Sequence, residues 1–356
     1  MKISLVGLGL IGSSIARALR GKHEIVAYNR SEKTRRRALE LGIVSACFDS
    51  IKNAVEDADI IIICTPLSTY EPILKEVAEH IKPDALVTDV GSVKTIAVEL
   101  GNKYIGKENF IAGHPIAGTE NSGVDAGFAE LFQGKKVILT PEIMNENVEK
   151  LQVLWKETGA DVHYLDCKKH DEIYAFVSHL AQFLCWISLE NEPSFDTEDK
   201  YLHQFYRIVA SDEKMWKDIF LYNKQPLIET LNEFLSVLED IKNADKNELV
   251  DIFTKANLLR KESFTDDVFD MKDVVLKEDY LLPVIVSFAY AKAVYDLDKK
   301  YDIPIGEHTC TSLADMTLFA LCDVEKSVEL VLNSDTSEII ESLKTRSLNS
   351  KFIQQH

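Results

Sequence analysis

The chain has 356 residues, with 40 lysines and arginines against 58 aspartates and glutamates, so its formal net charge is −18. This length predicts two domains, and the acidic balance argues against nucleic acid or an anionic membrane as a partner. The six cysteines are scattered without C-x-x-C spacing, so we expect reduced thiols and no metal site. We also expect a cytoplasmic protein, because no signal peptide opens the chain and no apolar run has the length of a membrane span.

The first predicted element is a short apolar strand over residues 2–6, which leads into the pattern G-x-G-x-x-G at residues 7–12. A helix-forming stretch and a second strand over residues 24–28 follow. In this setting the glycines permit a tight turn, a close approach of a pyrophosphate and close packing of the helix on the sheet. The alternative is a plain strand-to-helix turn. The residues expected to contact the dinucleotide here are Gly7, Gly9, Leu10, Ile11 and Gly12.

The residue that ends the second strand bears on which dinucleotide is preferred. An acidic residue there would bind the 2′-hydroxyl of NAD and repel a 2′-phosphate. This chain has Asn29, followed by Arg30 and Ser31. A neutral side chain beside a guanidinium and a hydroxyl suits a 2′-phosphate, so we expect NADP to be preferred over NAD. The alternative is that this basic run is a solvated helix face.

Strands and helices alternate from residue 1 to about residue 165. Apolar strands are predicted over residues 59–66, 85–90, 110–115 and 136–141, and helices over 32–41, 51–58 and 70–80. Repeated units of this kind predict a doubly wound α/β sheet, whose ligand crevice lies at the C-terminal ends of its strands. The candidate residues at those ends are Thr65, Pro66, Ser92 and His114.

Helical patterns replace this alternation after Asp166, and glycine becomes rare. Helices are predicted over residues 171–190, 201–212, 216–238 and 246–264. We therefore expect a Rossmann domain over 1–166 followed by an all-α region, with a substrate and dimerisation domain over 167–268 and a further helical extension over 269–356. This extension is either a diverged repeat of the preceding unit or a set of amphipathic helices similar by convergence.

Ser92 and His114 both follow strands on the cofactor side of the predicted sheet. A neutral imidazole there could accept the proton of a substrate hydroxyl while hydride leaves the carbon for a nicotinamide, since a pKa of about 6.5 suits a base at neutral pH. Ser92 could orient that hydroxyl. For His114 by itself a structural role is an equal alternative, but the neighbouring glycines of residues 112–120 favour a functional one.

Several motifs along residues 1–265 occur in one characteristic order. They are Gly7–Ser14, Asp89–Lys94, Gly113–Gly123, His170–Asp171, Ser178–Leu180, Arg207–Asp212 and Met215–Ile219. Together these motifs resemble the prephenate and arogenate dehydrogenases. The resemblance implies an oxidative decarboxylation in tyrosine biosynthesis, in which prephenate gives 4-hydroxyphenylpyruvate and a hydride passes to NAD(P)⁺.

The resemblance also implies roles for individual residues. His114 would be the hydrogen-bond acceptor on the C4 hydroxyl of the substrate, and Ser92 would orient substrate and nicotinamide. Arg207 would bind a substrate carboxylate. Glu120 would shape the pocket, and His179 would line it.

The chain departs from the family pattern near the expected substrate pocket. The family commonly reads Ser-His-Leu-Pro-His where this chain has Gln182 in place of the second histidine, and residues 201–206 replace a glycine-rich approach to Arg207. The choice between prephenate and arogenate therefore stays open. Two further hypotheses are a dehydrogenase or reductase of another small carboxylate and a non-catalytic dinucleotide-binding subunit. We expect a homodimer that associates through the helices.

Two other polar positions have structural interpretations. His170 and Asp171 open the long predicted helix, where an acidic residue favours the positive end of the helix dipole, so we interpret this pair as helix initiation rather than catalysis. Lys94 either approaches substrate or cofactor or is a solvated lysine.

Overall fold

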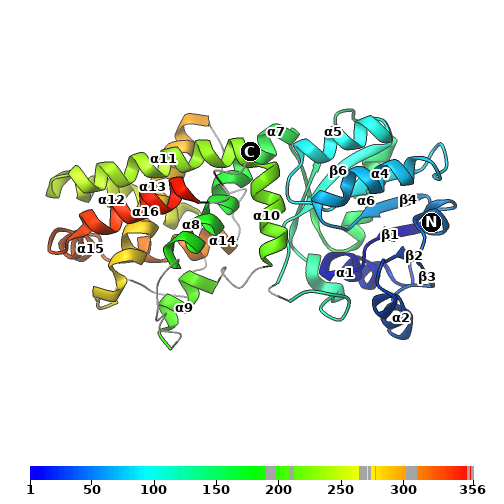
Figure 1. Ribbon diagram of the computed structural model, residues 1–356, viewed down its shortest axis with the longest axis horizontal. Helices are drawn as coiled ribbons and strands as arrows, with labels where there is room; N and C mark the ends of the chain where they lie inside the picture. Colours follow the sequence, from blue (N-terminus) through cyan, green and yellow to red (C-terminus); the bar gives the residue numbers. More distant parts are fainter. Residues whose placement is uncertain are drawn as a thin grey trace. The chain divides into compact units, whose positions relative to one another are not determined.

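The computed structural model describes residues 1–119, 121–189, 198–207, 212–263, 271, 274–276, 278–301, 311–350 and 353. Its contacts divide the chain into two compact units. Met1–Asp171 and Asp212–Tyr222 form the first unit, and Glu172–Ser211 and Asn223–His356 form the second. The first unit is an α/β sheet structure and the second is helical (Figure 1), which confirms the predicted fold class.

The first unit is built on an eight-stranded sheet with the order β3-β2-β1-β4-β5-β6-β7-β8. Only β6 and β7 run antiparallel among the paired neighbours of this sheet in the described part of the chain. The strands are β1 Lys2–Val6, β2 Glu24–Tyr28, β3 Ala46–Phe48, β4 Ile60–Ile63, β5 Leu86–Asp89, β6 Phe110–Pro115, β7 Lys136–Thr140 and β8 Asp161–Tyr164. The order of the strands reverses between β1 and β4, and ligands of open α/β sheets bind at such a switch point.

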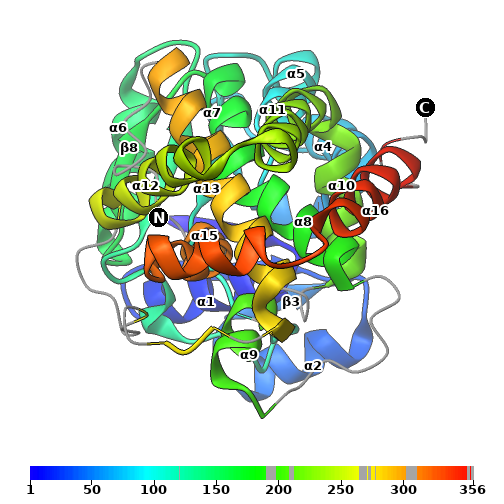
Figure 2. The same ribbon diagram turned by 90° about the vertical axis from the view of Figure 1, so that its left-hand side faces the viewer.

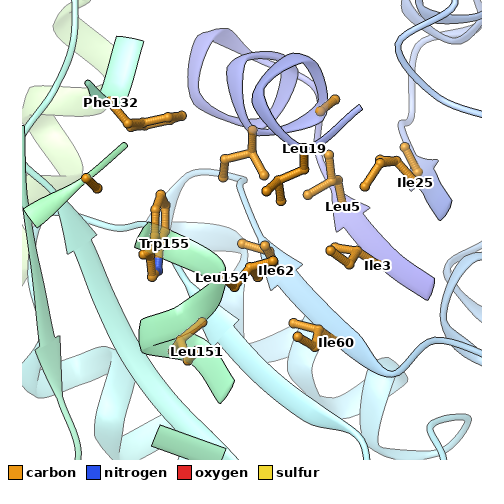
Figure 3. Packing of buried hydrophobic residues seen from close by; sticks show 14 of the residues in the cluster. Ile3, Leu5, Leu19, Ile25, Ile60, Ile62, Phe132, Leu151, Leu154 and Trp155 are labelled. Atoms are coloured by element: carbon orange, nitrogen blue, oxygen red, sulfur yellow. The ribbon is translucent and has the colours of Figure 1, made fainter. Parts of the chain in front are cut away.

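Helices cover this sheet and complete its core. They are α1 Leu10–Leu19, α2 Glu32–Glu40, α3 Ile51–Val55, η1 Leu67–Thr69, α4 Tyr70–Ala78, α5 Thr95–Tyr104, η2 Ala129–Phe132, α6 Glu146–Glu157 and α10 Glu213–Tyr222. Leu19 of α1 packs beside Leu5 of β1, while Leu154 and Trp155 of α6 lie near Ile62 of β4 (Figure 3). Each such fully buried aliphatic side chain contributes about 1.5–3 kcal/mol, so this packing fixes α1 and its preceding loop on the sheet.

The second unit is all-helical. Its elements in the described residues are the end of α7 Cys167–Tyr174, the π-helix η3 Ala175–His179, α8 Leu180–Leu189, α9 Lys200–Tyr206, α11 Lys224–Asn243, α12 Lys246–Ser263, η5 Glu278–Tyr280, α13 Leu281–Tyr301, α14 Thr311–Met316, η7 Leu318–Leu321, α15 Val324–Leu332 and α16 Thr336–Asn349. α13 is buried on nearly all sides and packs on α11 and α12, and α15 and α16 lie against α12 and α11 (Figure 2). Helices α13, α15 and α16 therefore share one core with α11 and α12.

The continuous helix Cys167–Leu189 corrects one expectation. It has 23 residues, and by length and composition alone it is apolar enough to cross a membrane, whereas no apolar run of that length was expected from the sequence. However, 78% of its most apolar window is buried inside the structure, as is common for the core helix of a globular domain.

The single helix predicted over residues 216–238 is wrong, because the chain leaves helical geometry at Asn223. α10 ends at Tyr222 and α11 begins at Lys224. The side-chain amide of Asn223 lies 2.9 Å from Nδ1 of His179. The periodicity of apolar residues carries no information about such a side-chain contact. It therefore predicted one helix where the structure has two. Part of another predicted helix, residues 208–211 of 201–212, lies outside the described residues.

Candidate active site

The glycine loop after β1 has the geometry that a dinucleotide needs. Gly7 has φ of +108°, and a Cβ there would lie 2.9 Å from the carbonyl oxygen of Cys64. A Cβ on Gly12 would lie 2.3 Å from the carbonyl oxygen of Gly7, so both positions require glycine. A Cβ on Gly9 would meet nothing within 4 Å. The loop is thus closed on the protein side and open beside Gly9.

The helix that follows this loop presents backbone donors at its start. α1 begins at Leu10, and no side chain caps its first turn. The hydroxyls of Ser13 and Ser14 donate instead to the carbonyl oxygens of Gly9 and Leu10, at 2.7 and 2.8 Å. Uncapped N–H groups at a helix N-terminus favour anions, and the residues at this point can hold the pyrophosphate of a dinucleotide.

The residues after β2 are partly engaged with one another. The Asn29 side chain accepts a hydrogen bond from the backbone of Ser31, and Ser31 caps α2 through the N–H of Thr34. Arg35 donates to the carbonyl oxygens of Asn29 and Arg30. Arg30 itself is exposed.

The segment after β4 also borders the C-terminal edge of the sheet. Thr65 is half-buried, and its hydroxyl accepts a hydrogen bond from Thr69 at 2.9 Å. Pro66 is exposed and precedes the short helix η1. Both residues follow the strand that lies on the other side of the switch point from β2.

His114 lies at the C-terminal end of β6 and begins a chain of hydrogen-bonded side chains. Its Nδ1 is 2.9 Å from Nε2 of His170, and Nδ1 of His170 is 2.8 Å from Oδ1 of Asp171. His114 is half-buried, whereas His170 is fully buried. Burial lowers the pKa of His170, so this imidazole is neutral near pH 7.

Asp171 anchors this chain to a helix that lies far away in sequence. Its carboxylate accepts hydrogen bonds from the backbone N–H groups of Lys94, at 2.7 Å, and Thr95, at 2.8 Å, which open α5. Burial favours the neutral acid, but the hydrogen bond from His170 and these backbone donors outweigh it, and the pKa of Asp171 lies below its ordinary value. Asp171 is therefore an ionised acceptor at neutral pH.

The interpretation of His170 and Asp171 as helix initiation is wrong. α7 begins at Cys167, and Asp166 caps it by accepting from the N–H groups of Lys168 and Lys169. Asp171 instead stabilises the start of α5, 77 residues earlier. The only sequence signal for this role was the adjacent His-Asp pair within the family motif, and its partner His114 was not visible from spacing.

Lys94 is neither solvated nor exposed to a ligand, which corrects both expectations for it. It is fully buried, and its Nζ lies 2.5 Å from Oδ2 of Asp89 and 2.7 Å from the carbonyl oxygen of Gly113. Asp89 also accepts from the N–H of Gly113 at 3.0 Å and from the hydroxyl of Tyr70 at 2.8 Å. Burial lowers the pKa of Lys94, and Asp89 opposes that shift. This buried pair ties the end of β5 to the residue before His114.

Ser92 lies in the chain between Asp89 and Lys94, the two members of this buried pair. It is half-buried in the loop between β5 and α5, one residue after Gly91, whose N–H donates to Asp89 at 2.8 Å. Loop and strand are thus held by the same carboxylate. Ser92 and His114 both belong to the α/β unit, at the C-terminal edge of neighbouring parallel strands.

The helical unit contains three of the residues assigned to the substrate, namely His179, Gln182 and Arg207. His179 ends the π-helix η3, a type of segment that occurs often at functional sites, and is almost fully buried. Gln182 follows one turn later and is fully buried, and neither its Oε1 nor its Nε2 has a hydrogen-bond partner in the described part of the chain. An unsatisfied buried amide costs about 1–3 kcal/mol of stability.

Arg207 follows α9 and has an ionic partner from the last part of the chain. Its Nη2 lies 2.8 Å from Oδ2 of Asp315, and Gln204 donates to the other carboxylate oxygen at 2.8 Å. The Arg207 side chain is 42% exposed, whereas that of Asp315 is 2% exposed. Glu120, the remaining predicted substrate residue, lies outside the described residues.

The doubly wound sheet, the open glycine loop and the histidine at the end of β6 define a dinucleotide-binding protein of the dehydrogenase type. Two family models match most of the chain: "Prephenate dehydrogenase, nucleotide-binding domain" over residues 15–164 and "Prephenate dehydrogenase, dimerization domain" over residues 166–256. The chain belongs to the prephenate dehydrogenase family, which confirms the resemblance seen in the sequence.

Individual relatives agree with this assignment. The chain is 31% identical to the cyclohexadienyl dehydrogenase of Zymomonas mobilis, over 74% of this chain and 96% of that protein. It is 34% identical to the prephenate dehydrogenase of Lactococcus lactis, over 67% and 70% of the two chains. Among solved structures, prephenate dehydrogenase of Aquifex aeolicus in complex with hydroxyphenyl propionate and NAD⁺ superposes with a TM-score of 0.63 and 32% identity, covering 68% of this chain and 89% of that one.

Proposed function

We propose that this protein is a prephenate or arogenate dehydrogenase that uses NAD(P)⁺. The observation that carries the proposal is the hydrogen-bonded series from His114 through His170 to Asp171, in the same α/β unit as a dinucleotide loop and in a chain of this family. The relatives named above are prephenate and cyclohexadienyl dehydrogenases, which supports the same reaction here.

The hydrogen-bonded series assigns a tautomer to His114. Ionised Asp171 can only accept, so Nδ1 of His170 carries the proton that it donates. Neutral His170 then has its lone pair on Nε2, and Nδ1 of His114 must donate to it. A neutral His114 consequently has its own lone pair on Nε2. That nitrogen is the hydrogen-bond acceptor that the reaction requires.

His114 would accept the hydrogen bond of the C4 hydroxyl and draw electron density into the C4–O bond. The bound nicotinamide supplies the acceptor for the hydride that leaves C4. The electron pair of the broken bond to the ring carboxylate enters the ring, CO₂ departs and the ring becomes aromatic. No net proton is released, so His114 needs only to polarise the hydroxyl and return the proton to the product. Ser92 would orient the same hydroxyl from its anchored loop.

The residues of the glycine loop fit a dinucleotide, and the choice between NAD and NADP depends on the residues after β2. We assign the pyrophosphate to the backbone at Gly7, Gly9 and Gly12, with Leu10 and Ile11 at the start of α1. NADP is the preferred cofactor in this proposal, because neutral Asn29 does not repel a 2′-phosphate and exposed Arg30 can pair with it.

The remaining assignments concern the substrate and the assembly. Arg207 would bind a substrate carboxylate, and His179 and Gln182 would contact the substrate side chain. A pocket-shaping role of Glu120 stays a prediction. A homodimer is supported by the match to the family's dimerization domain, and a cytoplasmic location stays a prediction from composition.

The test is turnover by the purified protein. Prephenate and arogenate are each offered with NAD⁺ and with NADP⁺, and the absorbance of the reduced nicotinamide is followed. We expect rapid reduction with at least one substrate and faster reduction of NADP⁺. If neither substrate gives reduced cofactor, although the protein still binds the dinucleotide, the proposal is contradicted. That result would favour a different carboxylate substrate or a non-catalytic subunit.

A further inference from the structure

The last part of the chain contacts the segments that carry the proposed substrate residues. The family models end at residue 256, so α13 and α14 lie beyond them. α14 packs on η3, α8 and α9. These three segments hold His179 and Gln182 and lead to Arg207.

Side chains from this region hold α9 at both of its ends. At the start, the hydroxyl of Tyr280 donates to Oδ2 of Asp199 at 2.6 Å. Asp199 caps α9 with its other oxygen, which accepts from the N–H groups of Tyr201 and Leu202. At the end of α9, the carboxylate of Asp315 accepts hydrogen bonds from the side chains of Arg207 and Gln204. The orientation of α9 thus depends on two contacts supplied from beyond the family's matched region.

A third contact supports the segment before His179. The hydroxyl of Tyr290 on α13 donates to the carbonyl oxygen of Phe176 at 2.5 Å. Phe176 lies within the π-helix η3, where the hydrogen-bond pattern of an ordinary α-helix is interrupted. Tyr290 is fully buried, so this bond is shielded from water.

Asp315 pairs a buried carboxylate with a partly exposed arginine side chain. Burial raises the pKa of Asp315, and the charges of Arg207 and of the buried Arg260 on α12 oppose that shift. Both oxygens of Asp315 are already hydrogen-bonded and almost wholly buried. The carboxylate therefore orients Arg207, whose side chain is 42% exposed and can meet an incoming anion.

We propose that Asp315 is a positioning residue that aims Arg207 at the substrate carboxylate, so that α14 forms a working part of the substrate site. This inference rests on the proposed function. A guanidinium held on one side has fewer orientations to lose when a carboxylate binds, and the affinity gain comes from that preorganisation. Asp315 is not a catalytic residue in this proposal, because it acts on the substrate only through Arg207.

Binding of two product-like phenols tests the proposal without turnover. The probes are 3-(4-hydroxyphenyl)propionate, which has a carboxylate, and 4-ethylphenol, which lacks it, each titrated into the wild-type protein and Asp315→Asn with the dinucleotide bound. We expect the Kd of the propionate to rise about tenfold or more, and that of 4-ethylphenol to change less than about twofold. A damaged pocket would weaken both probes equally, and that result, like unchanged binding of the propionate, would overturn the proposal.

A double-mutant cycle shows whether Asp315 acts through Arg207. Arg207→Gln should weaken the propionate, and adding Asp315→Asn to it should cause no further loss, because the residue being aimed is gone. Additive losses would refute the positioning role. Glu341→Gln is the matched control: it removes a carboxylate from another ion pair of the last part of the chain, with Lys242, and should leave both Kd values unchanged.

Two further measurements distinguish a failure of the proposed function from a failure of the role of Asp315. If Asp315→Asn does not fold, Gln204→Met decides the matter, since it leaves the ion pair and removes only the bond that orients Asp315; we expect a loss of about threefold for the propionate alone. If the wild-type protein binds no propionate and turns over no prephenate or arogenate, the proposed function fails. Wild-type turnover with unchanged variants would overturn only the role of Asp315.

Discussion

Nε2 of His170 lies 2.9 Å from Nδ1 of His114, although the two residues are 56 positions apart in the chain. His170 is in turn held by Asp171, whose carboxylate is fixed by the first N–H groups of α5. The orientation and tautomer of His114 therefore depend on a buried series that ends at a helix N-terminus. A role for the series in catalysis makes measurable predictions for each of its members.

Asp171→Asn should lower kcat by about 100-fold or more, because an amide no longer compels His170 to donate from Nδ1 and His114 loses its enforced tautomer. Dinucleotide affinity should stay near the wild-type value. Asp166→Asn is the control, since asparagine caps a helix about as well as aspartate and the variant keeps the backbone hydrogen bond from the N–H of His170 to the carbonyl oxygen of residue 166, so stability should change by less than about 1 kcal/mol. Similar kcat values for the two variants would argue against the series.

His114→Asn should lower kcat by about 100-fold or more while the KM for substrate changes little. Asparagine fills similar space, but its amide is a far weaker proton acceptor than imidazole. Steady-state kinetics with the better of the two substrates measures the effect. A kcat within a few-fold of wild type would show that His114 is structural.

Gln182→Met should stabilise the protein and weaken the substrate at the same time. The change removes a buried amide with unsatisfied hydrogen-bonding groups, so the free energy of unfolding should rise by about 1 kcal/mol. It also removes the donor and acceptor offered to the substrate side chain, so KM should rise several-fold. Urea unfolding and initial rates provide both values. A stabilised variant with unchanged KM for both substrates would exclude Gln182 from substrate binding.

Asn29→Asp should shift cofactor preference from NADP⁺ towards NAD⁺, because a carboxylate repels the 2′-phosphate and accepts from the 2′-hydroxyl. The measurement is the ratio of kcat/KM for the two cofactors. Arg30→Ala should weaken NADP⁺ selectively and leave NAD⁺ nearly unaffected. Equal use of both cofactors in wild type and variants would remove the assigned contact with a 2′-phosphate.

Stability should fall as the solution is acidified through the ordinary pKa of histidine. Burial holds the pKa of His170 below its usual value of about 6.5, so below that pH the unfolded chain binds more protons than the folded one. The free energy of unfolding therefore decreases as pH falls from about 7 to about 5. His170→Asn should show a smaller decrease in the same urea unfolding experiments, and identical pH slopes would contradict this account.

The elements near the glycine loop were predictable because their signals are local. Gly7 and Gly12 are required by contacts within one strand-to-helix turn, and the apolar runs of β1, β4 and β5 are typical of buried parallel strands. The helix predicted over 216–238 failed at Asn223 for the opposite reason. The helix is interrupted at Asn223, whose side chain contacts His179, a residue 44 positions earlier in the chain.

Sequence alone determined the class of sheet, the dinucleotide loop and the family, since these depend on residue type and short spacing. Tertiary structure decided which polar residues support the site. Lys94 became a buried partner of Asp89, Asp171 became the anchor of His170, and Asp315 reached Arg207 across 108 residues. Such pairs have no periodicity to reveal them, because hydrogen bonds between distant side chains form only where packing brings their atoms within about 3 Å.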